Sequence, residues 1–260
     1  MVKVNNNFYI KGQSSIVNYP IAANSINNKD SFAKENSSYH SQTAPYITSP
    51  TFVNFNYNYL LAAYSNKASV EDMIAKNPNV KQLLDSQNVA LEISPENVMA
   101  ISDKHLKTTK AFALQIANQM NLSRVDKQII EQACTFHDFG KILIPKSILN
   151  KPGKLTPEEK SIMDLHAQLG YELLSTTDMN KRTLELIKNH HLPQSQNKDI
   201  LGQILSVADI YSALREERPY KKAFTQFEAF KILDQKAKDG EVSAEVVDAL
   251  KASYITGIAV

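Results

Sequence analysis

Histidine and aspartate side chains are the groups of this sequence whose types and spacing could do chemistry. The chain has six histidines, and all but His40 fall at the ends or on the apolar faces of expected helices. These five are His105, His137, His166, His190 and His191. Asp138 directly follows His137, and Asp209 lies inside the apolar run 204–210. An unpaired carboxylate in such a run would cost on the order of several kcal/mol, so a cation is expected beside it.

Each of these residues has a purely structural alternative when it is taken alone. A histidine on an apolar helix face is more often hydrogen-bonded inside a core than bound to a metal ion. Asp209 could form a salt bridge with an arginine or lysine, or face solvent. The set as a whole favours a shared site, provided that the helices form a bundle.

Imidazole nitrogen together with carboxylate oxygen, and without thiolate, is the ligand chemistry of a first-row divalent ion. Iron, manganese, cobalt or zinc fits it better than calcium or magnesium. A carboxylate can bridge two ions about 3.5 to 4 Å apart, so His137 and Asp138 offer one terminal ligand and one bridge. Two such ions activate a water and neutralise the charge that develops in phosphoryl transfer. The pattern therefore predicts metal-dependent cleavage of a phosphoester.

Helices must position these ligands, and most of the expected helices start with a capping signal. Ser94 precedes proline at a first helical position, Ser123 opens another helix, and Thr156 and Thr225 each stand three residues before a glutamate. Further helices are expected after Ser69 and over about 178–190, 199–216 and 243–253. Since no strand is predicted after residue 69, we expect an all-α domain.

The N-terminal part has a different composition. Residues 1–68 are rich in Asn, Ser and Tyr without sustained periodicity, which predicts a mostly disordered arm. Short strands are the alternative, because Phe52, Phe55, Tyr57 and Tyr59 nearly alternate with polar residues. The arm could dock on a protein partner. We expect a helical lead-in over 69–96 and the main domain over 97–253.

Charge and cysteine content exclude several classes of protein. The net charge of +2 gives no basis for binding a DNA or RNA duplex. The single Cys134 excludes an internal disulfide and indicates a cytoplasmic protein. No run approaches the roughly 18 to 20 apolar residues of a membrane span, so none is expected.

Several segments, taken in order, resemble one known family. They are His137–Lys141 (HDFGK), Ile144–Pro145, Lys151–Thr156 (KPGKLT), His166 followed by Gly170, His190–His191, Ala208–Asp209, Ala213–Leu214 and Arg218–Lys221 (RPYK). The order is similar to that of the HD superfamily of metal-dependent phosphohydrolases, and specifically to its HD-GYP branch. The dipeptide His-Asp alone would carry no information, but the ordered set is specific.

The resemblance implies an HD-type helical bundle around a two- or three-metal centre that hydrolyses a cyclic dinucleotide such as cyclic di-GMP. By motif, the implied metal ligands are His137, Asp138, His166, His190, His191 and Asp209. Asp138 is the implied bridge, and His105 matches the histidine associated with a third ion. The implied phosphate-binding residues are Lys141, Arg218 and Lys221, which suits the chemistry of ammonium and guanidinium groups. Ordinary solvated cations are the alternative for Arg218 and Lys221.

Three departures from the branch affect these expectations. The Gly-Tyr-Pro loop after the paired histidines is absent, and only 17 residues (192–208) separate His191 from Asp209. Ile101 stands where an acid is expected one turn before His105, which favours two ions over three. Ser212 replaces an acid of the Ala-Asp-x-x-Asp-Ala-Leu string, a change among the residues around the ligands.

The sequence therefore predicts a phosphodiesterase that contains two divalent transition-metal ions, iron or manganese, and cuts a cyclic dinucleotide with metal-activated water. Asp138 and Lys141 are the expected catalytic residues. One alternative is a signalling module that binds a nucleotide or a protein partner without turnover, as the missing loop would allow. Another is an HD phosphohydrolase that acts on a different nucleotide phosphoester.

Overall fold

The computed structural model describes residues 66–217 and 222–255, and within these ranges all of the regular structure is helical. The all-α prediction is confirmed for these residues. Residues 1–65 of the predicted arm, its alternative strands and His40 lie outside them, whereas Lys67 and Ala68, at the end of the predicted arm, belong to a helix. In chain order the helices are α2 (Lys67–Lys76), α3 (Asn79–Ser86), α4 (Pro95–Gln119), α5 (Arg124–Phe136), the 3₁₀ helix η1 (Phe139–Leu143), α6 (Lys146–Leu149), α7 (Pro157–Leu174), α8 (Lys181–Asn189), α9 (Ile200–Arg215), α10 (Gln226–Lys238) and α11 (Ala244–Ile255). No helix in the described ranges is long and apolar enough to cross a membrane.

Side-chain caps start most of these helices where the sequence predicts them. The Ser123 hydroxyl accepts a hydrogen bond from the backbone N–H of Asp126. Thr156 and Thr225 form reciprocal capping boxes with the glutamates three residues later. These caps satisfy N–H groups that have no partner within the helix, so they fix where α5, α7 and α10 begin.

Three helix starts differ from the prediction. Helix α2 begins at Lys67, capped by Asn66, and not after Ser69, and α8 begins at Lys181, capped by Asn180, and not at about residue 178. The Ser94 hydroxyl makes no capping bond to α4 and instead donates to the Glu92 carboxylate. An alternative side-chain partner nearby can therefore replace a local capping bond.

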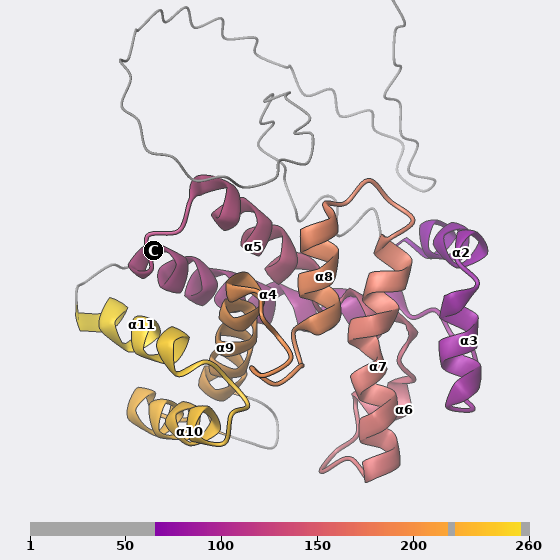
Figure 1. The fold of residues 1–260 in the computed structure, drawn as a ribbon. Helices are drawn as coiled ribbons and strands as arrows, with labels where there is room; N and C mark the ends of the chain where they lie inside the picture. Colours follow the sequence, from indigo (N-terminus) through magenta and orange to yellow (C-terminus); the bar gives the residue numbers. More distant parts are fainter. Residues whose placement is uncertain (1–65, 218–221, 256–260) are drawn as a thin grey trace, which may run out of the picture. The chain divides into compact units, whose positions relative to one another are not determined.

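Helix α4 runs through the middle of the bundle and contacts α5, α9, α11 and η1 (Figure 1). The buried apolar side chains form two clusters. One includes side chains from α2, α3, η1, α7 and α8, and the other includes side chains from α4, α5, α9, α10 and α11. Fully buried side chains such as Phe139 and Leu169 fill the first cluster, and Tyr211 lies in the second. The candidate ligands come from helices of both clusters.

A close backbone crossing joins η1 to α7. A Cβ atom added to Gly140 would lie 2.0 Å from the His166 carbonyl oxygen and 2.5 Å from the Gly170 nitrogen. Only a glycine permits this approach. Because Asp138 directly precedes η1 and His166 lies on α7, the crossing sets how near these two residues come.

The lead-in helices α2 and α3 pack against α7. Val70, Val80 and Leu84 are fully buried in the first cluster. The turn between the two helices also covers the buried carboxylate of Glu172, which accepts hydrogen bonds from the Asn77 side chain at 2.8 Å. The lead-in thus contributes both apolar surface and polar partners to α7.

Candidate metal centre

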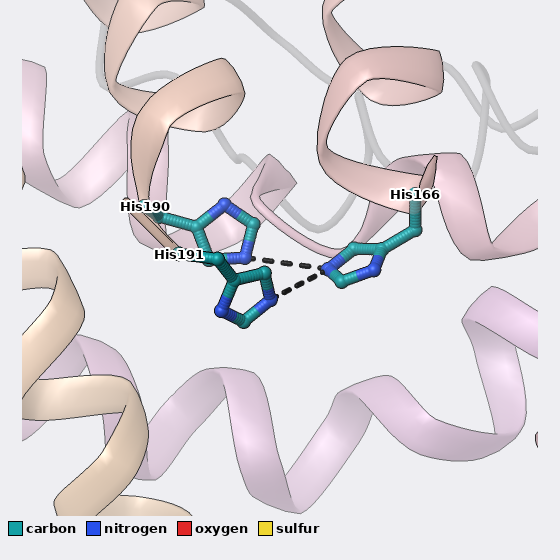
Figure 2. A group of neighbouring side chains, drawn as sticks. All are labelled: His166, His190 and His191. Atoms are coloured by element: carbon teal, nitrogen blue, oxygen red, sulfur yellow. Dashed lines mark hydrogen bonds between the residues drawn. The ribbon is translucent and has the colours of Figure 1, made fainter. Parts of the chain in front are cut away.

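The structure brings six candidate ligands into two groups whose ligand atoms lie within 4.8 Å of one another. The first group is His166 from α7 with His190 and His191 from the end of α8, and Figure 2 shows the three rings facing one another. The second group is His105 from α4, His137 from the end of α5 and Asp209 from α9. Both groups are of the kind that holds a divalent transition ion.

Main-chain carbonyls determine which nitrogen of three histidines carries the proton. The Nδ1 atoms of His137, His166 and His190 lie 2.9, 2.6 and 2.7 Å from the carbonyl oxygen three residues earlier in the chain. Since a carbonyl can only accept, each Nδ1–H must donate, and the neutral ring then has a lone pair on Nε2. All three rings thus present Nε2 as a ligand atom.

The spacing within the first group fits a shared ion. The Nε2 atom of His166 lies 3.3 Å from that of His190 and 3.1 Å from that of His191 (Figure 2). Between neutral His166 and His190 rings this contact has no proton to share. Two nitrogens bound at about 2.0 to 2.1 Å to one ion lie about 2.8 to 3.4 Å apart at octahedral or tetrahedral angles. A cation between the lone pairs therefore accounts for the arrangement.

The second group combines an acid with two imidazoles. Asp209 Oδ1 lies 2.9 Å from Nε2 of His105 and 3.7 Å from Nε2 of His137. The Nε2 atom of His137 is buried and makes no hydrogen bond within the described ranges. A buried lone pair without a partner is costly in a purely structural role and is what a metal ligand requires.

Asp138 lies between the two groups. Its Oδ1 is 3.4 Å from Nε2 of His166, and its Oδ2 is 3.6 Å from Nε2 of His137. The Lys141 ammonium donates to the same Oδ2 at 2.7 Å. One carboxylate thus offers an oxygen to each group, which is the disposition of a bridging ligand.

Both acids are ionised, although Asp138 is buried and Asp209 is only partly exposed. Burial by itself would raise the pKa of Asp138, but Lys141, His137 and His166 hold that pKa well below its ordinary value. Burial would likewise raise the pKa of Asp209, and the nearby rings of His105 and His137 hold it well below the ordinary value. The centre therefore has two negative charges available for cations.

The histidines respond to their surroundings in opposite ways. Burial, with a further contribution from Lys141, lowers the pKa of His166 to about 3. Burial and the neighbouring imidazoles lower the pKa of His190 well below its ordinary value. Burial opposes protonation of His137 too, but Asp138 and Asp209 outweigh it and raise the pKa of that residue. His166 and His190 are thus neutral and ready to act as ligands, whereas the two acids favour positive charge at His137.

His191 is the most exposed of the candidate ligands, whereas His105, His137, His166 and His190 are buried. We therefore expect a substrate to approach over His191.

All seven candidate ligands of the sequence analysis lie in or between these groups, and Lys141 lies beside Asp138. Arg218 and Lys221 are outside the described residues, as is the side chain of Ile101. Ser212 lies next to the second group, with its Oγ 3.3 Å from Nδ1 of His105.

Sequence reasoning missed three residues that support the site. Asn97 donates to the carbonyl oxygens of Lys141 and Ile144 and so holds η1 against α4. In the short loop after the paired histidines, Asn197 is buried, and a Cβ atom on Gly202 would lie 2.4 Å from its side chain. Glu216, at the end of α9, places Oε2 3.6 Å from Nδ1 of His105. Only Glu216 had a usable signal, which is its position one helical turn after Ser212.

A helical bundle that gathers histidine and aspartate ligands from separate helices is the arrangement of a metal-dependent phosphohydrolase. The chain belongs to the HD domain family, since the model of that family matches residues 69–246. Phosphohydrolases of this family depend on metal ions, and the two groups described above are His/Asp sites suited to such ions.

Several curated proteins are similar to this chain. The cyclic di-GMP phosphodiesterase response regulator RpfG of Xanthomonas campestris is 38% identical over 122 residues, which are 42% of this chain and 32% of the relative. A cyclic di-GMP phosphodiesterase of Thermotoga maritima is 35% identical over 159 residues, which are 56% of this chain and 43% of the relative. The 3'3'-cGAMP-specific phosphodiesterase 2 of Vibrio cholerae is 32% identical over 136 residues, which are 46% of this chain and 26% of the relative. The chain thus spans less than half the length of these relatives.

One solved structure is also similar. The HD domain of the phosphodiesterase PgpH of L. monocytogenes, in complex with cyclic-di-AMP, aligns with a TM-score of 0.47 and 18% identity. The alignment covers 70% of this chain and 95% of that domain.

Proposed function

We propose that this chain is a metal-dependent phosphodiesterase of HD-GYP type that hydrolyses a cyclic dinucleotide. The observation that carries the proposal is the position of Asp138, with one oxygen toward each of the two ligand groups. A carboxylate that joins two sets of imidazoles is suited to a pair of ions, and a pair of ions is suited to a phosphodiester. The proposal places the enzyme in the cytoplasm, in line with its single cysteine.

The similar proteins support the choice of substrate class. Two of them are named for cyclic di-GMP and one for 3'3'-cGAMP. Cyclic dinucleotides are therefore the first substrates to test. The shortened loop of residues 192–199 changes the segment that follows His191 at the open side of the site, so the preferred dinucleotide can differ from that of any one relative.

We assign the ligands by group. His166, His190 and His191 would hold one ion, His105, His137 and Asp209 would hold the other, and Asp138 would bind both. Iron and manganese suit this mixture of nitrogen and oxygen ligands. Ions bound there would supply hydroxide near neutral pH and offset the charge on the phosphoryl oxygens.

Lys141 has a second task besides its ion pair. Its ammonium has three N–H groups. One of them donates a hydrogen bond to Asp138, so the others remain available to a phosphate oxygen. The side chain is 18% exposed, which lets a substrate reach it. Arg218 and Lys221 are assigned to the remaining phosphate charge on the basis of their motif.

The test combines metal analysis with hydrolysis. Protein purified without chelator is analysed for metal content and assayed against cyclic di-GMP, 3'3'-cGAMP, cyclic-di-AMP and a chromogenic phosphodiester. We expect two ions per chain, and we expect Asp138→Asn to lower turnover by about a thousandfold or more, because several kcal/mol of charge stabilisation is lost. Asp164→Asn, at an exposed acid on α7, is the matched control and should retain full activity.

The other outcomes identify the alternatives. Binding of a dinucleotide without turnover and without metal would make the chain a non-catalytic signalling module. Turnover of the chromogenic diester without turnover of any cyclic dinucleotide would point to another nucleotide phosphoester. Either result would overturn the proposed function.

A further inference from the structure

His105 has side-chain partners at both of its ring nitrogens. Its Nε2 lies 2.9 Å from Asp209 Oδ1, while its Nδ1 faces Ser212 of α9 at 3.3 Å and Glu216, the residue that follows α9, at 3.6 Å. These side chains therefore influence which ring nitrogen carries the proton.

The hydroxyl of Thr108 restricts what Ser212 can do. Thr108 Oγ1 lies 3.0 Å from each of two α4 carbonyl oxygens, those of Lys104 and His105, and its single proton is directed to them. In the 2.5 Å contact between Thr108 and Ser212 the proton then belongs to Ser212. The Ser212 oxygen has only lone pairs left for Nδ1 of His105, so Nδ1 must be the donor.

Glu216 points to the same assignment independently. Its carboxylate can only accept, so a proton on Nδ1 makes the 3.6 Å approach favourable and a lone pair there makes it unfavourable. The Glu216 side chain is 19% exposed, so water screens this interaction only in part. Two different acceptors thus favour a proton on Nδ1.

A neutral His105 ring with its proton on Nδ1 has a lone pair on Nε2. That lone pair converges with Asp209 Oδ1 and with the unpartnered Nε2 of His137. Three electron-rich atoms directed at one point need a cation. One alternative is that Thr108 and Ser212 reverse their hydroxyl protons and Nε2–H of His105 donates to Asp209. Another is that both ring nitrogens carry protons, one directed to Asp209 and one to the side chains of Ser212 and Glu216. In either case His105 is not a ligand.

We propose that Ser212 and Glu216 are positioning residues that hold the Nδ1 proton of His105 and thereby direct its Nε2 to a metal ion shared with His137 and Asp209. The inference rests on the proposed function, since it deepens the assignment of the second ligand group. Ser212 stands where an acid is expected. In this inference Glu216, four residues later at the end of α9, supplies a carboxylate near His105 in its place. Outer partners of this kind typically contribute about 10- to 100-fold to metal affinity.

The first test is the proton position itself. Nitrogen NMR of the full chain, labelled at histidine and loaded with zinc, distinguishes protonated, free and metal-bound ring nitrogens. We expect His105 to have a protonated Nδ1 and a metal-bound Nε2. A protonated Nε2 on His105, with His166 and His190 bound to zinc, would overturn this inference and leave the proposed function standing. Absence of zinc from every histidine would overturn both.

The second test is metal affinity measured by titration with zinc, independently of turnover. Glu216→Gln and Ser212→Ala should each weaken the second binding step by about tenfold and leave the first unchanged. Ser212→Asp places an acceptor carboxylate beside Nδ1 and should restore the affinity of the Glu216→Gln chain.

The matched control is Glu217→Gln, which removes the same charge from the neighbouring exposed residue. It should leave both binding steps unchanged. Equal effects of Glu216→Gln and Glu217→Gln would overturn the inference, because a general loss of negative charge would then explain the result.

Discussion

The two ligand groups are built differently. In the first, His166 and His190 are oriented by carbonyls of their own helices, and both rings are neutral. In the second, His137 is also bonded to a carbonyl of its own helix but lies beside ionised acids that raise its pKa, and His105 contacts the side chains of Ser212 and Glu216. Local backbone geometry thus orients rings in both groups, and the second group depends in addition on tertiary contacts and charge.

This difference teaches where such a centre can vary. A bond between Nδ1 and a carbonyl three residues earlier lies within one helix, so it does not depend on side chains of other helices. The orientation of His105 requires Thr108, Ser212 and Glu216 to be compatible with one another. Substitutions that change metal binding without touching a ligand are therefore expected around the second group.

The largest loss of stability is expected from a substitution at the crossing of η1 and α7, which positions Asp138 between the two ligand groups. Gly140→Ala places a Cβ atom 2.0 Å from the His166 carbonyl oxygen, so η1 must move away from α7. We expect the free energy of unfolding to fall by about 3 kcal/mol and the Asp138 oxygen to be lost from the first group. Urea unfolding and metal analysis check both effects.

Gly170→Ala is the graded control for the same crossing. Its Cβ would lie 3.2 Å from the Gly140 nitrogen, a contact that a small shift can relieve. The loss of stability should be clearly smaller, about 1 kcal/mol. Equal unfolding midpoints for Gly140→Ala and the wild type would show that the crossing does not set the distance between Asp138 and His166.

A smaller effect is expected from acid on the metal-free protein. The pKa of His166 is about 3 in the folded chain and about 6.5 in an unfolded one, so between these values the unfolded state binds more protons. Stability from this residue is present above pH 6.5 and is lost as the pH falls. Between pH 7.5 and 5.5 the loss is about 1.4 kcal/mol for this single group.

Urea unfolding with chelator at the two pH values measures this contribution. In His166→Gln the fall in stability between pH 7.5 and 5.5 should be smaller by that amount. His137→Gln should make the fall steeper, because a raised pKa stabilises the folded state as the pH decreases. If both variants changed the pH-dependent fall in stability in the same direction, the contrast between the two groups would be contradicted.

The smallest loss of stability is expected from removing the side-chain caps at the starts of α7 and α10. Thr156→Ala and Thr225→Ala each remove a capping box and should each cost about 1 kcal/mol of stability. Neither should change zinc affinity, because the bond that orients His166 lies ten residues from the cap. A loss of affinity in Thr156→Ala alone would mean that the geometry of the first group extends along the whole helix.

Local signals account for the part of the structure that could be predicted from sequence. The helices that begin after Ser123, Thr156 and Thr225 follow capping rules that involve neighbouring residues. The candidate ligands were found because their types and order are specific, and the bundle brings them together.

The remaining features depend on contacts between distant segments. The approach of Glu216 to His105 joins residues 111 positions apart in number, and the Gly140 crossing depends on how η1 lies on α7. No periodicity in either segment describes such pairings, because they arise only once the helices have packed. Ser94 differs for a local reason, because its hydroxyl donates to the Glu92 carboxylate two residues earlier and does not cap α4.

The buried carboxylate of Glu172 sets a lower limit on the smallest piece of this chain that can fold alone. A fragment that starts at residue 97 would remove the amides of Asn77 and Asn79, which both donate to Glu172 Oε2. It would also strip the apolar cover that Val80 and Leu84 provide. Helices α2 and α3 are therefore integral to the fold, and the autonomous unit extends back at least to Asn66.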